Sequence, residues 1–88
     1  MTKAYVYSKQ QCPFCIKAKQ LLEKENIDYA EFEVGVNGLT KEVIQGIVDK
    51  MEINVEIKTV PQIFLFEEDS GGLQYIGGFT ELKQHLHK

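Results

Sequence analysis

The two cysteines of the sequence, Cys12 and Cys15, stand three positions apart, between an apolar run and a segment with helical periodicity. If a helix begins at Pro13, Cys12 takes the cap position and Cys15 lies one turn along, so the two sulfur atoms are close enough to join. The free N–H groups and the positive end of the helix dipole favour a thiolate there, which lowers the pKa of the first cysteine. Proline also suits the first helical position. Because a thiolate attacks disulfides, the pattern predicts thiol–disulfide exchange.

Size and charge narrow the class of protein. A chain of 88 residues predicts one domain, residues 1–88, with a small core. The net charge of −3 and the absence of arginine argue against a nucleic-acid binder. No apolar run approaches the ~20 residues that span a bilayer, and the N-terminus lacks the apolar core of a signal peptide, so we expect a cytoplasmic protein without a membrane role. In a reducing compartment, two cysteines this close favour a redox or metal role over a structural cross-link.

Strand and helix patterns alternate along the first half of the chain. Residues 3–8 carry apolar side chains at both odd and even positions, which predicts a central strand covered on both faces. Residues 13–26 have the apolar spacing of an amphipathic helix. Residues 29–34 alternate apolar and charged side chains, as a strand near a sheet edge does. Thr40 has the position of an N-cap for a helix that continues to Met51. The inward side chains of that helix are predicted to be Leu39, Val43, Ile47, Val48 and Met51, with Ile44 placed to pack against Leu39.

The second half predicts a hairpin and a last helix. Residues 52–60 fit either a short strand or an extended crossover. A buried strand at 63–66, a polar turn at 67–72 and a return strand at 73–76 follow, and the last helix is expected to begin near Thr80. The order β-α-β-α-β-β-α predicts an α/β fold, a four-stranded mixed sheet with helices on both faces, in which helical crossovers join parallel pairs. C-x-x-C beside a β-α-β pattern is typical of a thioredoxin-like redox fold.

Three segments carry a resemblance to a known family. They are Cys12-Pro13-Phe14-Cys15, Thr59-Val60-Pro61-Gln62-Ile63-Phe64 and Gly77-Gly78-Phe79-Thr80-Glu81-Leu82. In this order and spacing they resemble the signatures of dithiol glutaredoxins, and residues 38–42 are similar to the small bacterial and phage type. Phe14 stands where tyrosine is common, and the turn at 67–72 is longer than in the shortest members. The resemblance implies a thioredoxin-like fold and a monomer without a permanently bound cofactor.

The resemblance also implies an activity, the glutathione-dependent reduction of protein disulfides and of glutathione mixed disulfides. Cys12 would attack the substrate disulfide, and Cys15 would resolve mixed disulfides with proteins by closing the Cys12–Cys15 bond. Glutathione would then reduce that bond in two steps. Proteins of this type resemble electron donors to cytosolic reductases such as ribonucleotide reductase.

Glutathione itself is expected in a groove beside the cysteines. Lys9 resembles the family's cation near the glycine carboxylate of glutathione, and Lys58 and Gln62 are candidates for the same carboxylate. The family has a cis-proline at the position of Pro61. A cis bond there would leave the N–H and C=O of Val60 free to pair with the cysteine of glutathione.

The far end of the groove is expected at the start of the last helix. There the N–H groups of Phe79 and Thr80 would bind the γ-glutamyl carboxylate, and Glu81 would take the amino group. Phe14 is expected to be an exposed ring that contacts partners, and Tyr7 to belong to the core. The predicted glutathione-binding set is Lys9, Phe14, Lys58, Thr59, Val60, Pro61, Gln62, Gly78, Phe79, Thr80 and Glu81, and no metal site is predicted.

Each assignment has a plainer structural alternative. Lys9 and Lys58 also fit ordinary surface lysines, and Gln62 also fits a residue that points off its strand. Thr80 fits an ordinary N-cap, and Glu81 fits a first-turn acid that is favourable to the helix dipole.

Three alternatives concern the whole activity. A thioredoxin-like protein reduced by a flavoprotein is disfavoured by the missing tryptophan before Cys12 and by residues 77–81. A zinc site made of the cysteines with His85 and His87 lacks the usual ligand spacing, and the histidines fit surface positions. Iron–sulfur cluster carriage by a dimer is disfavoured by Pro13.

Overall fold

Side chains alternate along the central strand, so that this strand contributes to a core on each face of the sheet. In the computed structural model, which describes residues 1–87, the strand β1 runs over Thr2–Ser8. Ala4 and Val6 are fully buried on one face, whereas Tyr5 and Tyr7 are half-buried and pack on the other. β1 pairs with a strand on each side. The prediction of a central strand covered on both faces is therefore confirmed.

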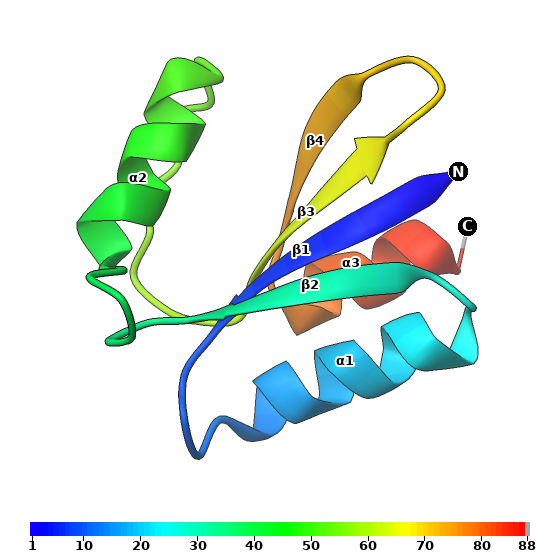
Figure 1. The fold of residues 1–88 in the computed structure, drawn as a ribbon, viewed down its shortest axis with the longest axis horizontal. Helices are drawn as coiled ribbons and strands as arrows, with labels where there is room; N and C mark the ends of the chain where they lie inside the picture. The colour runs from blue at the N-terminus through cyan, green and yellow to red at the C-terminus, as the bar shows by residue number, and fades with distance from the viewer. Residues whose placement is uncertain (88) are drawn as a thin grey trace.

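The sheet has four strands in the order β2-β1-β3-β4, and Figure 1 shows them with the three helices. The elements are β1 (Thr2–Ser8), α1 (Pro13–Lys24), β2 (Asp28–Glu33), α2 (Lys41–Lys50), β3 (Gln62–Glu67), β4 (Gly72–Gly77) and α3 (Phe79–Leu86). β1 and β2 are parallel, and β3 is antiparallel to both of its neighbours. The predicted element order and mixed sheet are confirmed, and β2 lies at the edge as expected.

One topological expectation is wrong. Helical crossovers were expected to join parallel pairs, but only α1 does so, because β3 runs antiparallel to β1. β2 ends beside the end of β1, and β3 begins at that same end of the sheet, where Gln62 pairs with Tyr7. α2 and the segment after it therefore leave and re-enter the sheet at one end instead of crossing its length. Figure 1 shows α2 standing at that end.

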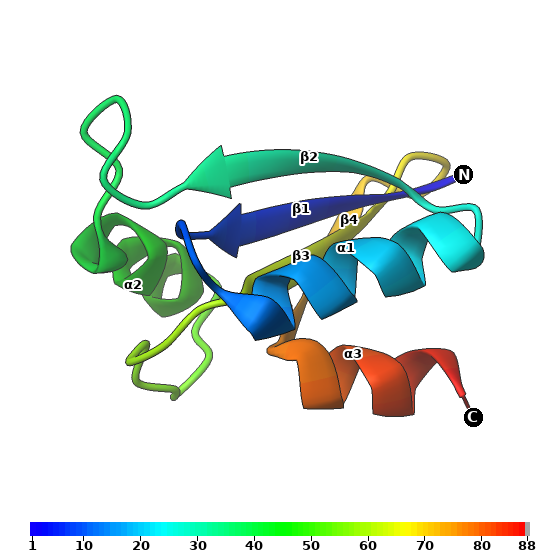
Figure 2. The same ribbon diagram turned by 90° about the horizontal axis from the view of Figure 1, so that it is seen from below.

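The helices α1 and α3 cover one face of the sheet together, as Figure 2 shows. The core between them contains Ala4, Val6, Ala18, Leu22, Ile63, Leu65 and Leu82. Burial of a leucine-sized side chain stabilises the fold by roughly 1.5–3 kcal/mol. This packing fixes the start of α1 and the start of α3 relative to β1 and β3.

A smaller core lies on the opposite face, under α2. Ile44 and Val48 of α2 are fully buried there, together with Ile57 and Phe64. The prediction that Val43 faces inward is wrong, since its side chain is 46% exposed. Ile44 and Val48 are four residues apart and lie on one side of the helix, which places Val43 at the outer border of that stripe. Helices thus pack on both faces of the sheet, as predicted, although α2 covers its face only at the end where it stands.

The helix ends follow from local chemistry. The Thr40 hydroxyl oxygen accepts a hydrogen bond from the Val43 N–H at 3.4 Å, which confirms the predicted N-cap of α2. α1 ends at Lys24 and not at the predicted residue 26, because Asn26 has a left-handed backbone with φ of 58°. Segment 52–60 forms no strand, and the extended-crossover interpretation is the correct one. Within residues 1–87, no helix is both long and apolar enough to cross a bilayer.

Candidate active site

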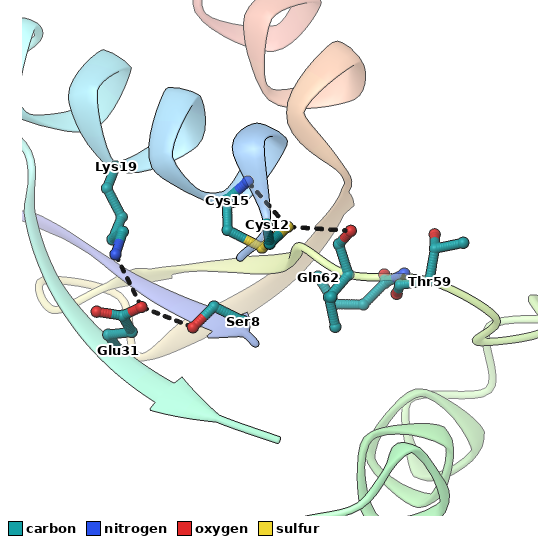
Figure 3. Close-up of a disulfide and its surroundings, with 8 residues drawn as sticks. Ser8, Cys12, Cys15, Lys19, Glu31, Thr59 and Gln62 are labelled. Carbon is teal, nitrogen blue, oxygen red and sulfur yellow. Dashed lines mark hydrogen bonds and ion pairs between the residues drawn. A yellow bond between two sulfur atoms is a disulfide. The ribbon is translucent and has the colours of Figure 1, made fainter. Parts of the chain in front are cut away.

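Cys12 and Cys15 lie at the start of α1 and are joined by a disulfide bond (Figure 3). Cys12 is the N-cap, and its sulfur accepts a hydrogen bond from the Cys15 N–H at 3.2 Å. Pro13 occupies the first helical position, as predicted. Cys12 is 6% exposed and Cys15 only 1%, so the first cysteine is the more accessible residue. This arrangement suits attack by Cys12 and resolution by Cys15, since N–H donors at a helix start stabilise a thiolate.

A second segment, 48 residues further along the chain, lies beside the disulfide. The peptide bond between Val60 and Pro61 is cis. The Val60 carbonyl oxygen is 3.8 Å from the Cys12 sulfur. In the disulfide that sulfur carries no proton, so the approach is a contact there, whereas a reduced thiol can donate a weak hydrogen bond to the same oxygen. The loop before β3 therefore borders the sulfur that would react.

A surface groove of about 330 Å³ runs from this loop to the start of α3. Its lining residues come from three separate parts of the chain, namely Phe14, Thr59, Val60, Pro61, Gly78, Phe79, Thr80 and Glu81. Every one of them belongs to the set predicted to bind glutathione. The Phe14 ring is 54% exposed and lies 6.2 Å from the Phe79 ring, measured between centroids. The fold thus gathers most of the predicted set around one groove next to Cys12.

The end of the groove at α3 differs from the expectation in one respect. Gly78 is the N-cap of α3, so the interpretation of Thr80 as the cap is wrong, and Thr80 lies exposed within the first turn. Glu81 does the capping instead, because its Oε1 accepts the Gly78 N–H at 2.7 Å. Glycine is required at position 77, where φ is 115° and a Cβ atom would lie 3.1 Å from the Glu81 side chain. The N–H groups of a first turn have no partner within the helix, and the first-turn residues of α3 line the groove.

The remaining predicted residues lie outside the groove lining. Lys9 is exposed, and Lys58 is exposed with its ammonium group 3.7 Å from Glu56. Gln62 is only 6% exposed, and its Nε2 donates to the Thr59 carbonyl oxygen at 2.7 Å. Direct contact of these three side chains with a ligand stays a prediction.

Sequence reasoning missed a polar cluster beneath the start of α1. Ser8 is fully buried, and its hydroxyl donates to Glu31 Oε2 at 2.6 Å, while Lys19 Nζ lies 2.9 Å from the same oxygen (Figure 3). The hydrogen bond from Ser8, followed by that from Lys19, lowers the pKa of the Glu31 carboxyl. The cluster links β1, β2 and α1 next to the cysteines. Its only signal in the sequence is a serine at an inward position of a central strand.

The alternative of a zinc site is not supported by the part of the chain that the structure describes. Across residues 1–87, no three His, Cys, Asp or Glu side chains gather in a way that could hold a metal ion. His85 is half-buried and His87 is exposed at the end of α3. The four candidate zinc ligands therefore do not form a site in this fold.

Comparison with known proteins agrees with this geometry. The family model for glutaredoxin matches residues 4–68. Glutaredoxin 1 of Rickettsia prowazekii is 37% identical over 89 residues, which cover 94% of this chain and 88% of that protein. The crystal structure of glutaredoxin 1 from Francisella tularensis with cacodylate has a TM-score of 0.75 at 32% identity, covering 98% of this chain and 93% of that one. The buckwheat glutaredoxin–glutathione complex shares the fold, with a TM-score of 0.66 at 21% identity over 97% of this chain and 69% of the other. With its paired cysteines at the start of α1, the chain belongs to the glutaredoxin family and is a thiol–disulfide oxidoreductase.

Proposed function

We propose that glutathione is the reductant of this enzyme and that it binds in the groove between the Thr59–Pro61 loop and the start of α3. The observation that carries this proposal is the groove itself, which extends from the loop bordering the Cys12 sulfur to a helix N-terminus. A helix N-terminus favours a carboxylate, and glutathione carries one at each end. The same tripeptide is bound by the buckwheat glutaredoxin that shares this fold.

The groove offers a partner for each part of the tripeptide. The γ-glutamyl carboxylate would accept hydrogen bonds from the first-turn N–H groups of Phe79 and Thr80, with Glu81 near the amino group. The extended backbone of Val60 would pair with the cysteine of glutathione, as a neighbouring strand does. Lys9 would then provide positive charge near the glycine carboxylate. The ligand sulfur would lie next to Cys12, where the exchange takes place.

The chemistry is a pair of sulfur-to-sulfur exchanges. The Cys12 thiolate attacks the glutathione sulfur of a glutathionylated protein, a Cys12–glutathione disulfide forms, and the protein thiolate leaves and takes up a proton. A second glutathione thiolate then attacks the glutathione sulfur of that bond, which releases glutathione disulfide and restores the Cys12 thiolate. In each step one S–S bond forms and one breaks.

Protein disulfides would need the second cysteine. After Cys12 has formed a mixed disulfide with the protein, Cys15 attacks the Cys12 sulfur and releases the second protein thiol. The resulting Cys12–Cys15 bond is the state found in the structure, and two glutathione molecules would reduce it. Acceptors would be glutathionylated or disulfide-bonded cytoplasmic proteins, with ribonucleotide reductase as one candidate, and we propose that the enzyme works as a monomer.

A glutathione-coupled assay on two variants tests these roles. Cys12→Ser should be inactive towards glutathionylated peptide and protein disulfide alike, because the attacking sulfur is gone. Cys15→Ser should retain deglutathionylation and lose protein-disulfide reduction. Circular dichroism of both variants serves as the control for folding. Equal loss of both activities in the two variants, or wild-type activity that does not depend on glutathione, would contradict the proposal.

A titration of Cys12 reactivity tests the chemistry separately. In reduced protein, the rate of iodoacetamide alkylation at Cys12 should level off well below the pH expected of a free thiol, which ionises near pH ~8.5. The Cys15→Ser variant isolates the Cys12 signal. Alkylation of Cys12 with the pH dependence of free cysteine would argue against a thiolate stabilised at the helix start.

A further inference from the structure

The loop wall of the groove, Thr59–Pro61, is preceded by a segment without regular secondary structure. Residues 53–58 belong to no helix or strand, so they lack a ladder of backbone hydrogen bonds to hold them. The polar groups of such a segment need other partners. Backbone carbonyl oxygens accept the N–H groups of Ile53 and Val55, and a side chain from outside the segment holds the part nearest to the loop wall.

The first of these partners is Gln45, on the side of α2 that faces the segment. Its Nε2 donates to the Val55 carbonyl oxygen at 2.8 Å, and its Oε1 accepts the Ile57 N–H at 2.8 Å. Nε2 also lies 3.0 Å from Asp49 Oδ1, one turn along the same helix, which fixes the orientation of the amide. The Gln45 amide therefore pairs with residues two apart in the segment, as a neighbouring strand would.

The anchored residue is close to the groove in sequence and in space. Ile57 is 7% exposed and packs with Ile44, Val48 and Phe64, so both its backbone and its side chain are held. Val60 is three positions after Ile57, a stretch of at most about 11 Å. A shift of Ile57 would therefore move Val60, whose carbonyl oxygen lies 3.8 Å from the Cys12 sulfur.

The second partner is Gln62, at the first position of β3. Its Nε2 donates to the Thr59 carbonyl oxygen at 2.7 Å, and its Oε1 accepts the hydroxyl proton of Tyr75 from β4. The side chain is nearly fully buried, so its amide faces the protein and not the groove. Gln45 thus holds the chain on the N-terminal side of the loop wall, and Gln62 holds it on the C-terminal side.

We propose that Gln45 is a positioning residue for the glutathione site, acting through Ile57 on the Thr59–Pro61 wall, and that Gln62 is its counterpart at the other end. The proposal rests on the proposed function, because it treats that wall as a glutathione-binding surface. The Val60 carbonyl oxygen is an acceptor and cannot stabilise the Cys12 thiolate, which is stabilised by the Cys15 N–H at the start of α1. A shift of Val60 should therefore change affinity more than the reactivity of the thiolate.

The test compares Gln45→Met with Gln20→Met in otherwise wild-type protein. Methionine has a similar length and helix propensity but cannot form the amide hydrogen bonds. Gln20 is an exposed residue of α1, so its variant makes the same chemical change away from the loop. For Gln45→Met we expect KM for a glutathionylated peptide to rise roughly five- to ten-fold, which corresponds to about 1–1.4 kcal/mol of weaker binding, with kcat little changed.

Two further measurements separate positioning from a general loss of stability. Hydrogen exchange of the Ile57 amide in ligand-free protein should be faster in Gln45→Met than in wild type or Gln20→Met. The rate of Cys12 alkylation should be the same in all three proteins. If Gln45→Met does not fold, Gln45→Lys, which can still donate to the Val55 carbonyl oxygen and to Asp49 but cannot accept from Ile57, should give a rise in KM in the same direction.

The outcomes distinguish the two proposals. Wild-type activity that is independent of glutathione would refute the proposed function itself. A wild-type enzyme that uses glutathione, together with an unchanged KM in Gln45→Met, would overturn the positioning role alone. If KM and the rate of Cys12 alkylation changed together, the positioning role would also be overturned, because the substitution would then act on the sulfur and not through the loop.

Discussion

The two walls of the groove beside Cys12 are built in different ways. The helical wall consists of the first turns of α1 and α3, where backbone hydrogen bonds and the packing of Leu82 fix each residue. The loop wall, Thr59–Pro61, has no such ladder and depends on side-chain amides from α2 and from β3. The helical wall is determined locally, whereas the loop wall depends on residues far away in the sequence.

This difference suggests that the two walls have different roles in the site. The helical wall holds the cysteines and the N–H groups of a helix start, which the chemistry requires in a fixed place. The loop wall contributes the backbone of Val60, whose carbonyl oxygen contacts the Cys12 sulfur but, as an acceptor, gives the thiolate no hydrogen bond. Substitutions that destabilise the protein equally should therefore change KM to different extents, depending on which wall they support.

The largest expected effect compares Ile57→Ala with Leu82→Ala. Both side chains are buried, at 7% and 0% exposed, and truncation should lower the free energy of unfolding by about 2–5 kcal/mol in each case. Ile57→Ala should raise KM for a glutathionylated peptide more than Leu82→Ala does, because backbone hydrogen bonds still hold the start of α3 whereas the loop wall has no such ladder. Urea denaturation and steady-state kinetics measure the two quantities. Equal rises in KM for both variants would show that the two walls do not differ in this way.

A smaller effect is expected at the cap of α3, on the helical wall. Glu81→Ala removes the acceptor of the Gly78 N–H and should lower the free energy of unfolding by about 1 kcal/mol. Glu81→Gln keeps an oxygen for that N–H and should retain most of the stability. If Gln proves as destabilising as Ala, the carboxylate charge and not the hydrogen bond would be the source of the stability.

The helical wall is also the part of the site that the sequence predicted best. A helix start is predicted from four residues alone, Cys12 to Cys15, because local chemistry determines the cap. The error at Thr80 was small, because Gly78 and Thr80 are both common near a helix start and only the structure shows which one lies outside the helix.

The loop wall could not be predicted in the same way. Gln45 lies 10 residues before Val55 and 12 before Ile57, and an isolated glutamine on a helix gives no periodic signal. Gln62 was predicted as a glutathione contact, and nothing in the sequence indicated that its amide also bonds the Thr59 carbonyl oxygen and the Tyr75 hydroxyl. Both facts depend on the tertiary path of the chain between α2 and β3, which the pattern of apolar residues does not determine.

The cluster beneath the helical wall gives a pH-dependent prediction. The hydrogen bonds from Ser8 and Lys19 lower the pKa of the Glu31 carboxyl from its ordinary value of 4.5. A lowered pKa in the folded state adds stability that is fully present above pH 4.5 and is lost as the pH falls through the folded value. Glu31→Gln should therefore lower stability at pH 7 and weaken its decline below pH 4.5.

The size of this effect should be modest. The Glu31 side chain is 36% exposed, so solvent screens its ion pair, and we expect a change below about 1 kcal/mol. Thermal unfolding between pH 3 and pH 7 measures it, with Glu33→Gln, a neighbouring acid on the same strand, as the control. If the stability of Glu31→Gln falls below pH 4.5 as steeply as that of the wild type, the cluster does not stabilise the contact between α1 and the sheet.

The smallest effects are expected from the two exposed lysines, each of which precedes one wall of the groove in the sequence. Lys9 precedes the helical wall, whereas Lys58 precedes the loop wall and lies 3.7 Å from Glu56. Lys9→Ala should weaken glutathione binding roughly two- to five-fold, the range expected of one exposed charge, and the loss should shrink at high salt. Lys58→Ala should change affinity less, because its charge is already balanced by Glu56. A larger effect at Lys58 than at Lys9 in a binding titration would move the site of carboxylate recognition to the loop wall, and an unchanged affinity in Lys9→Ala would make Lys9 an ordinary surface residue.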